Sequence, residues 1–115
     1  MSTCKVCITG ANGRVGRDLV AHLSGSGHLV TGLVRSEAAA EVVRQAGGVP
    51  VVAPLSASAD ITRTLSNQDW IFHLAGAVRG PGTETADVVN HQGTVQILDA
   101  LEQADRSELK AVVFS

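Results

Sequence analysis

The sequence predicts an α/β protein with a doubly wound parallel sheet and helices on both faces. Three observations support this prediction. Short apolar segments alternate along the 115-residue chain with segments of helical periodicity. The apolar segments are continuous and rich in β-branched residues, as in strands buried on both faces. The connections are short, which favours βαβ units with right-handed crossovers. We therefore expect one domain over residues 1–115, with about five strands in the order 3-2-1-4-5.

The boundaries of the expected elements come from turn and helix-stop signals. Glycines and serine at residues 25–27 end the first expected helix, and Gly47 and Gly48 end the second. A segment rich in Gly and Pro at residues 76–82 precedes the last helix. The expected strands are residues 5–9, 29–34, 49–53, 70–74 and 111–114. The expected helices are residues 14–24, 37–45, 59–66 and 85–103.

Two of these helices have apolar side chains on one face at helical spacing, and in the last helix we expect this stripe to be buried. In the first helix this stripe is Val15, Leu19 and Leu23. In the last helix it is Val88, Val95, Leu98 and Leu101.

Composition and charge narrow the class of protein. The formal net charge is −2 and the isoelectric point is near 6.0, with no basic stripe, so we expect no nucleic-acid partner. We find no apolar run long enough to span a bilayer and no signal-peptide pattern at the start. We therefore expect a cytoplasmic protein with no membrane partner.

The cysteines and histidines do not predict a metal site. Cys4 and Cys7 are spaced as Cys-x-x-Cys, but no second pair of ligands follows at zinc spacing. Both fall at the first expected strand and are interpreted as small apolar residues. The histidines have no ligand spacing, and His73 is expected to be a hydrogen-bonded residue of a buried strand.

The glycine-rich segment between the first strand and the first helix predicts a phosphate-binding loop. Gly10 permits a tight turn, Gly13 lets backbone approach a pyrophosphate, and Gly16 permits close packing of the helix. The unpaired N–H groups of the helix N-terminus would bind the phosphates. With this strand and helix around it, the loop predicts a Rossmann dinucleotide site. The candidate cofactor-binding residues here are Gly10, Asn12, Gly13, Arg14, Val15 and Gly16. A nucleotide triphosphatase loop is not present, since no Lys follows these glycines.

The end of the second expected strand indicates which dinucleotide is preferred. An acidic residue there would bind the ribose hydroxyls of NAD, whereas an Arg accommodates the 2′-phosphate of NADP. This chain has Arg35, a permanent cation, followed by Ser36, a further hydrogen-bond donor. We therefore expect NADP(H) to be preferred, with NAD(H) possible.

Together these segments resemble the extended short-chain dehydrogenase/reductase family, including its NAD-dependent epimerase/dehydratase group. The similar segments are residues 5–16, 33–36, 69–76, 89–94 and 112–115. The resemblance implies that Leu74, Ala75 and Gly76 lie beside the nicotinamide ribose and that Leu55 packs on adenine. The family usually has Asp-Leu where this chain has Pro54 and Leu55, so the carboxylate that accepts from adenine is missing.

The catalytic residues of that family are not predicted within this chain. The family uses Ser with a Tyr-x-x-x-Lys pair, and the chain contains no Tyr. Ser115 aligns with the first residue of the family's serine-rich turn, not with its catalytic Ser. The chain is therefore expected to be the N-terminal portion of a reductase, epimerase or dehydratase, apparently truncated after the fifth strand.

The sequence leaves two alternative functions open, and it also predicts how the chain assembles. The chain could instead be a non-catalytic dinucleotide-binding sensor module, or a folded remnant without a ligand. An uncovered sheet edge or helix faces predict a homo-oligomer.

Overall fold

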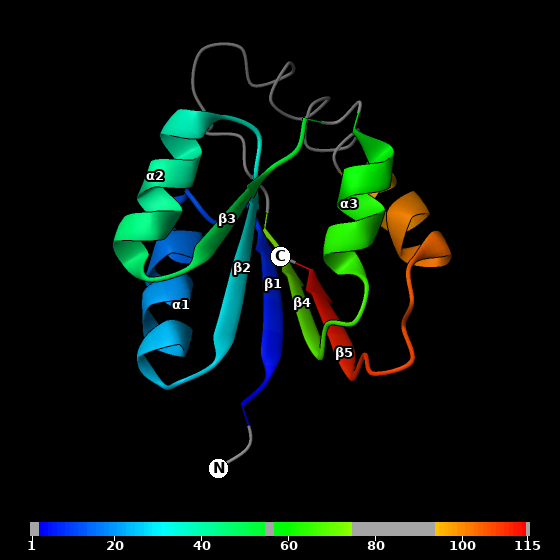
Figure 1. Ribbon diagram of the computed structural model, residues 1–115, viewed down its shortest axis with the longest axis horizontal. Coiled ribbons are helices and arrows are strands. Elements are labelled where there is room, and N and C mark those ends of the chain that lie inside the picture. Colours follow the sequence, from blue (N-terminus) through cyan, green and yellow to red (C-terminus); the bar gives the residue numbers. More distant parts are fainter. Residues whose placement is uncertain (1–2, 55–56, 75–93, 115) are drawn as a thin grey trace.

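The chain forms a five-stranded parallel sheet in the order β3-β2-β1-β4-β5 (Figure 1). The computed structural model describes residues 3–54, 57–74 and 94–114. The strands are β1 (Lys5–Thr9), β2 (Leu29–Val34), β3 (Val49–Val52), β4 (Trp70–His73) and β5 (Ala111–Phe114). The doubly wound α/β class and the strand order expected from the sequence are both confirmed.

Helices cover both faces of the sheet (Figure 1). They are α1 (Arg14–Gly25), α2 (Glu37–Ala46) and α3 (Ser58–Leu65), and residues 94–103 are also helical. Alternate residues of β1 show the two layers: Val6 and Ile8 belong to the core under α1 and α2, whereas Cys7 belongs to the core under α3 and residues 94–103. The loop rich in Gly and Pro that was expected at residues 76–82 lies outside the described residues, as does the expected start of the last helix at residue 85.

The register of the sheet brings the carboxyl ends of its strands to one edge. Thr9, the last residue of β1, pairs with Leu33 of β2 on one side and with His73 of β4 on the other. His73 in turn pairs with Phe114 of β5. The segments that leave these strands therefore start side by side, as in other open α/β sheets that bind ligands at this edge.

The buried helix faces differ from the predicted stripes. In α1, Val15 is 69 % exposed, whereas Leu19 and Leu23 are half-buried and pack against the core. The fully buried residues of this helix are Gly16 and Val20. Small residues let α1 approach closely, so its contact face is centred one position beyond the large side chains.

The helix at residues 94–103 shows the same displacement. Ile97, Ala100 and Leu101 are buried there, whereas Val95 and Leu98 are exposed. Of the predicted stripe, only Leu101 is confirmed as buried, and Val88 lies outside the described residues.

The two cysteines behave as structural residues. Cys7 is fully buried in β1, Cys4 is half-buried just before it, and both are free thiols. Burial raises the pKa of the Cys7 thiol to about 12. In the part of the chain that the structure describes, no three His, Cys, Asp or Glu residues cluster as metal ligands would.

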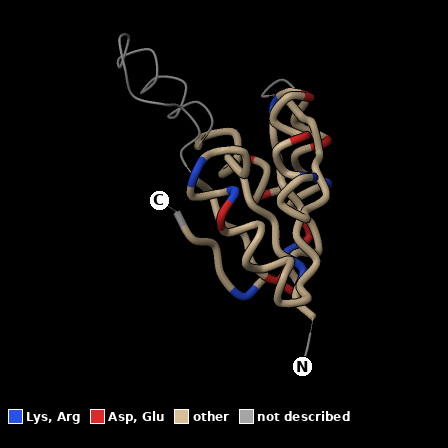
Figure 2. The backbone as a smooth tube through the Cα atoms, turned by 90° about the vertical axis from the view of Figure 1, so that its left-hand side faces the viewer, with Lys and Arg blue, Asp and Glu red and all other residues tan. Residues whose placement is uncertain are grey.

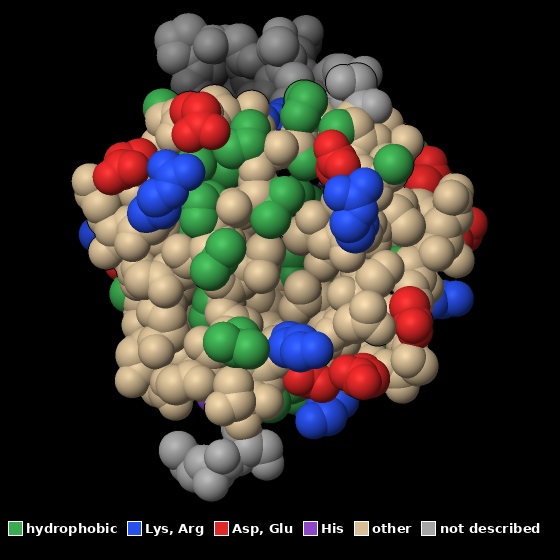
Figure 3. Space-filling model, in the orientation of Figure 1, with side chains coloured by type: hydrophobic (Ala, Val, Ile, Leu, Met, Phe, Trp, Pro, Cys, Tyr) green, Lys and Arg blue, Asp and Glu red, His purple; other side chains and the backbone are tan. Residues whose placement is uncertain are grey.

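The surface mixes charges of both signs. Figure 2 shows Lys and Arg interspersed with Asp and Glu along the chain. Hydrophobic side chains follow the diagonal course of β3 in Figure 3, and Val49 and Val52 of this edge strand are exposed. None of the described helices has the length and apolar character needed to cross a membrane.

Candidate dinucleotide-binding site

The carboxyl edge of the sheet brings three of the predicted site segments together. The loop from Gly10 to Gly16 follows β1, Arg35 follows β2, and Leu74 follows β4, and these are neighbouring strands. Leu55, Ala75 and Gly76, which were also predicted to contact the cofactor, lie outside the described residues, as does Asn90 of the family-like segment.

Gly10 forms the tight turn that leaves β1. Its φ of +68° lies in the left-handed region, and an added Cβ would lie 2.6 Å from the carbonyl oxygen of Leu74. The Gly10 carbonyl accepts a hydrogen bond from the N–H of Gly13 at 3.1 Å, which closes the turn. The chain at this position therefore requires glycine for both backbone and steric reasons.

Gly16 permits α1 to pack onto this turn. A Cβ on Gly16 would overlap the Gly10 carbonyl oxygen and would lie 2.8 Å from the Cα of Ala11. The close packing expected at Gly16 is thus present, but its partner is the turn itself rather than a strand.

Gly13 differs from both, because none of the described residues crowds it. Among the described residues, a Cβ on Gly13 would meet only the Gly10 carbonyl oxygen, at 3.4 Å, which is an ordinary van der Waals contact. The residue is exposed and has extended backbone at the N-cap of α1. The described residues therefore leave space over Gly13, as a site for a phosphate that approaches the backbone requires.

The N-terminus of α1 also has no anion of its own. Its N-cap provides no side-chain hydrogen bond, and its first turn contains no Asp or Glu. By contrast, α2 is capped by the Ser36 hydroxyl and has Glu37 in its first turn. The unpaired N–H groups and partial positive charge of α1 therefore fit an external phosphate.

The other predicted residues of the loop surround this helix terminus. Asn12, Arg14 and Val15 are all exposed. Arg14 is the first residue of α1, so its guanidinium adds positive charge near the end of the helix that already favours anions.

Arg35 and Ser36 lie where β2 meets α2. Arg35 is exposed, and within residues 3–54, 57–74 and 94–114 it forms no ion pair. The Ser36 hydroxyl accepts a hydrogen bond from the N–H of Ala39 at 3.2 Å, which the sequence analysis did not assign to it. Its hydroxyl hydrogen can still donate, so the cap and the predicted phosphate contact are compatible.

His73 is a polar residue at this edge of the sheet, and it was not among the predicted cofactor residues. It is buried and bonded through both ring nitrogens, Nδ1 to Thr9 Oγ1 at 2.5 Å and Nε2 to Thr94 Oγ1 at 3.0 Å. Burial lowers its pKa below the ordinary histidine value, and the positive charge of Arg35 lowers it further. The expectation of a hydrogen-bonded histidine in a buried strand is confirmed.

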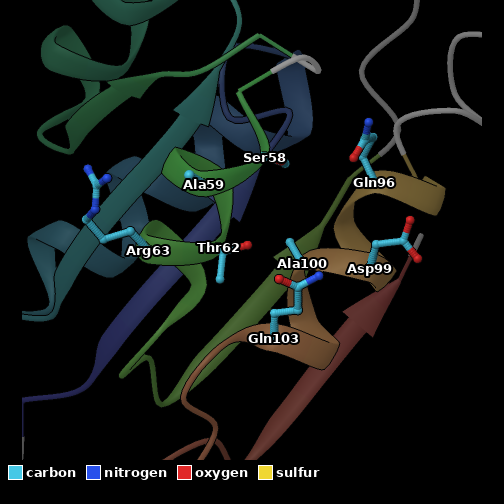
Figure 4. A pocket seen from close by; sticks show the side chains of 8 residues that line it. All are labelled: Ser58, Ala59, Thr62, Arg63, Gln96, Asp99, Ala100 and Gln103. Carbon is cyan, nitrogen blue, oxygen red and sulfur yellow. The ribbon is translucent and has the colours of Figure 1, made fainter.

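A separate pocket of about 380 Å³ lies between α3 and residues 94–103 (Figure 4). Six of its eight lining residues have polar or charged side chains, and none of the eight is a predicted cofactor residue. The lining residues are Ser58, Ala59, Thr62, Arg63, Gln96, Asp99, Ala100 and Gln103.

A strand, a glycine turn and an uncapped helix N-terminus at the carboxyl edge of a parallel sheet define a nucleotide-binding α/β protein of the Rossmann type. Residues 10–113 match the family model described as NAD(P)H-binding, and the chain belongs to this family. Its relatives lie in the epimerase/dehydratase and reductase group.

Two curated relatives show this similarity over most of the chain. The chain is 32 % identical over 98 residues to a 4-hydroxy-2-methyl-3-oxo-4-farnesyl-3,4-dihydroquinoline-1-oxide ketoreductase of Stigmatella aurantiaca, covering 84 % of this chain and 29 % of that protein. It is 31 % identical over 106 residues to a UDP-2-acetamido-2,6-beta-L-arabino-hexul-4-ose reductase of Pseudomonas aeruginosa, covering 90 % and 23 %.

A solved structure gives the same grouping. A putative NAD-dependent epimerase/dehydratase from Bacillus halodurans superimposes with a TM-score of 0.71 at 26 % identity, over 96 % of this chain and 50 % of that one. The chain spans between 23 % and 35 % of the length of the curated relatives that it matches.

Proposed function

We propose that this chain is the NADP(H)-binding N-terminal portion of an extended short-chain dehydrogenase/reductase. The observation that carries the proposal is Gly13 at an α1 N-terminus without an anion of its own, with Arg35 directly after the neighbouring strand β2; within the described residues Gly13 is uncrowded and Arg35 forms no ion pair. Together these provide one position for a pyrophosphate and a second for another phosphate.

The proposed contacts follow from this arrangement. The pyrophosphate lies over Gly13 and accepts hydrogen bonds from the first N–H groups of α1, with Arg14 beside it. The ribose 2′-phosphate is bound by Arg35 and Ser36. The family resemblance adds that the nicotinamide ribose would lie near residues 74–76 and that Leu55 would pack on adenine; of these residues, only Leu74 is among the described ones. When bound, the nicotinamide accepts or donates hydride.

The reaction itself is proposed for a longer protein. The chain has no tyrosine among its 115 residues, so the acid/base group of the family would not come from it. We propose that the whole protein acts on a carbonyl or carbinol substrate as a reductase, epimerase or dehydratase, while these residues hold the cofactor.

Two further expectations remain proposals about the setting of the protein. We propose a cytoplasmic location and self-association through the exposed edges of the sheet, where Val49 of β3 and Val113 of β5 are exposed. Sedimentation measurements across a range of concentrations test the self-association, and a concentration-independent monomer contradicts it.

Calorimetric titration with NADP⁺ and NAD⁺ tests the cofactor proposal. We expect NADP⁺ to bind more tightly, and Arg35→Ala to lose roughly 10- to 100-fold in NADP⁺ affinity while NAD⁺ affinity stays within about twofold. Arg44→Ala is the matched control, because Arg44 is an exposed arginine already paired with Glu37 and Glu41.

The possible contrary results separate the parts of this proposal. No binding of either dinucleotide contradicts the cofactor function. Equal affinity for the two, or an unchanged preference in Arg35→Ala, contradicts the 2′-phosphate contact alone.

A further inference from the structure

A buried histidine bridge joins three elements next to the glycine turn. His73, the last residue of β4, bonds through Nδ1 to Thr9, the last residue of β1, and through Nε2 to Thr94 of the helix at residues 94–103. Thr9 and His73 are direct register partners in the sheet and both are buried. The side-chain bond therefore fixes β1 to β4 at the end of the ladder.

The glycine turn begins at the residue after this bridge. The N–H of Leu74 donates to the Thr9 carbonyl at 3.3 Å, and the Leu74 carbonyl lies against Gly10 so closely that no Cβ fits between them. Gly10, which follows Thr9, begins the glycine turn, and Leu74, which follows His73, packs against that turn. We call the turn from Gly10 to Gly13 and the start of α1 the phosphate cradle.

A displacement of Thr9 would move the glycine turn, and with it the N–H groups of the predicted phosphate site. The Gly10 carbonyl accepts the N–H of Gly13 and packs against Gly16, so the turn and the start of α1 move together. Phosphate binding by backbone N–H groups depends on such preorganised positions.

The two bonds of the ring have different consequences. The Nδ1 bond reaches the strand that leads into the cradle, whereas the Nε2 bond reaches Thr94, on a helix whose core residues pack on the opposite face from α1. A hydroxyl can donate or accept, so one neutral imidazole can satisfy both threonines at once.

We propose that His73 is a positioning residue for the dinucleotide, acting on the cradle through its Nδ1 bond to Thr9, while its Nε2 bond to Thr94 attaches the helix. This inference rests on the proposed cofactor function. It predicts that cofactor affinity depends on the Thr9 hydroxyl and not on the Thr94 hydroxyl.

The test compares threonine variants of nearly constant shape in the full chain. Thr9→Val removes the hydroxyl and keeps the volume, and we expect NADP⁺ affinity to fall roughly tenfold. Thr9→Ser restores the hydroxyl, and affinity should return to within about threefold of wild type. Thr94→Val should lower the melting temperature while affinity stays within about twofold.

A second measurement covers the case in which Thr9→Val is poorly folded. Hydrogen exchange of the Gly13 N–H, which is bonded to the Gly10 carbonyl, reports the order of the turn directly. We expect this N–H to exchange faster in His73→Gln than in His73→Asn, because the Asn amide retains a group near the Nδ1 position.

The outcomes distinguish this inference from the proposed function. If wild type binds no dinucleotide, the cofactor function fails. If wild type binds and Thr9→Val binds equally well, or Thr94→Val weakens binding as much as Thr9→Val, the positioning role of His73 is overturned. Equal Gly13 exchange in the two His73 variants also overturns it.

Discussion

A Cβ atom added to Gly16 would overlap the carbonyl oxygen of Gly10. The same oxygen accepts the N–H of Gly13 at 3.1 Å. One carbonyl group therefore sets both the closure of the turn and the distance at which α1 packs on it. Of the three glycines, only Gly13 is free of crowding by the residues that the structure describes.

This difference predicts separate effects of alanine at the three positions. Gly16→Ala should lower the free energy of unfolding by ~1–3 kcal/mol, because the new methyl group must displace backbone. Gly10→Ala should be at least as destabilising, since it adds an unfavourable positive φ to a clash with Leu74. Gly13→Ala should change the free energy by less than ~1 kcal/mol. Urea unfolding measures all three.

Cofactor titration of the same variants completes the comparison. Gly13→Ala should remain folded and lose at least roughly tenfold in dinucleotide affinity, because its methyl group would occupy the position proposed for the phosphate. A folded Gly13→Ala with wild-type affinity would show that no phosphate lies over this residue.

The sequence predicted the fold well because its signals were local. Strands β1, β2 and β5 begin and end at the expected residues, and β3 and β4 each end one residue early. Even there the excluded residues stay bonded to the neighbouring strand, Ala53 to Val34 and Leu74 to Thr9. Apolar runs and glycine clusters are sufficient to locate such elements.

The buried helix faces and the histidine bridge were harder to predict because they depend on tertiary contacts. Periodicity gives weight to large side chains such as Val15, but Val15 is exposed, and the fully buried residues of α1 are Gly16 and Val20. The bond between Thr9 and His73 joins residues 64 positions apart and depends on the register of β1 and β4. Neither residue has a local signal for that pairing.

The corrected face of the helix at residues 94–103 gives a second prediction. Ile97 is 4 % exposed and its neighbour Leu98 is 46 % exposed. Ile97→Ala should cost ~2–5 kcal/mol of unfolding free energy because it leaves a cavity, whereas Leu98→Ala should cost less than ~1 kcal/mol. Chemical denaturation of the two variants measures these losses. A larger loss in Leu98→Ala than in Ile97→Ala would instead support the stripe predicted from the sequence.

Thiol labelling gives a third prediction. Because burial raises the pKa of Cys7 to about 12, almost none of it is thiolate at pH 8, and no reagent reaches it in the folded chain. We expect Cys4 alone to react rapidly with a maleimide or a disulfide reagent, and Cys7 only after unfolding. The variant Cys4→Ser should therefore show no fast phase. A fast phase in that variant would mean that β1 opens readily.

The lowered pKa of His73 gives a fourth prediction, concerning acid stability. The folded chain has a lower histidine pKa than the unfolded chain, so the unfolded state binds more protons as the pH falls through 6.5. The stabilisation is present above about pH 6.5 and is lost as the pH falls toward the depressed pKa of the folded chain. We expect the melting temperature to fall more between pH 7.5 and pH 5.5 in wild type than in His73→Asn. Equal slopes in the two proteins would show that His73 does not titrate with folding.

The electrostatic effect of Arg35 on His73 gives a fifth prediction. Burial is the larger cause of the lowered His73 pKa, and the charge of Arg35 is the second. In Arg35→Ala the His73 pKa should therefore rise but stay below the ordinary histidine value. Proton NMR titration of the histidine ring measures it, with Arg44→Ala as the control that leaves the value unchanged.

The same titration connects this pair to the cofactor. A 2′-phosphate bound by Arg35 would offset the arginine charge, so NADP⁺ should raise the His73 pKa more than NAD⁺ does. In Arg35→Ala the two dinucleotides should then have equal effects. An equal rise with NADP⁺ and NAD⁺ in wild type would show that the 2′-phosphate does not bind at Arg35, whichever dinucleotide the chain prefers.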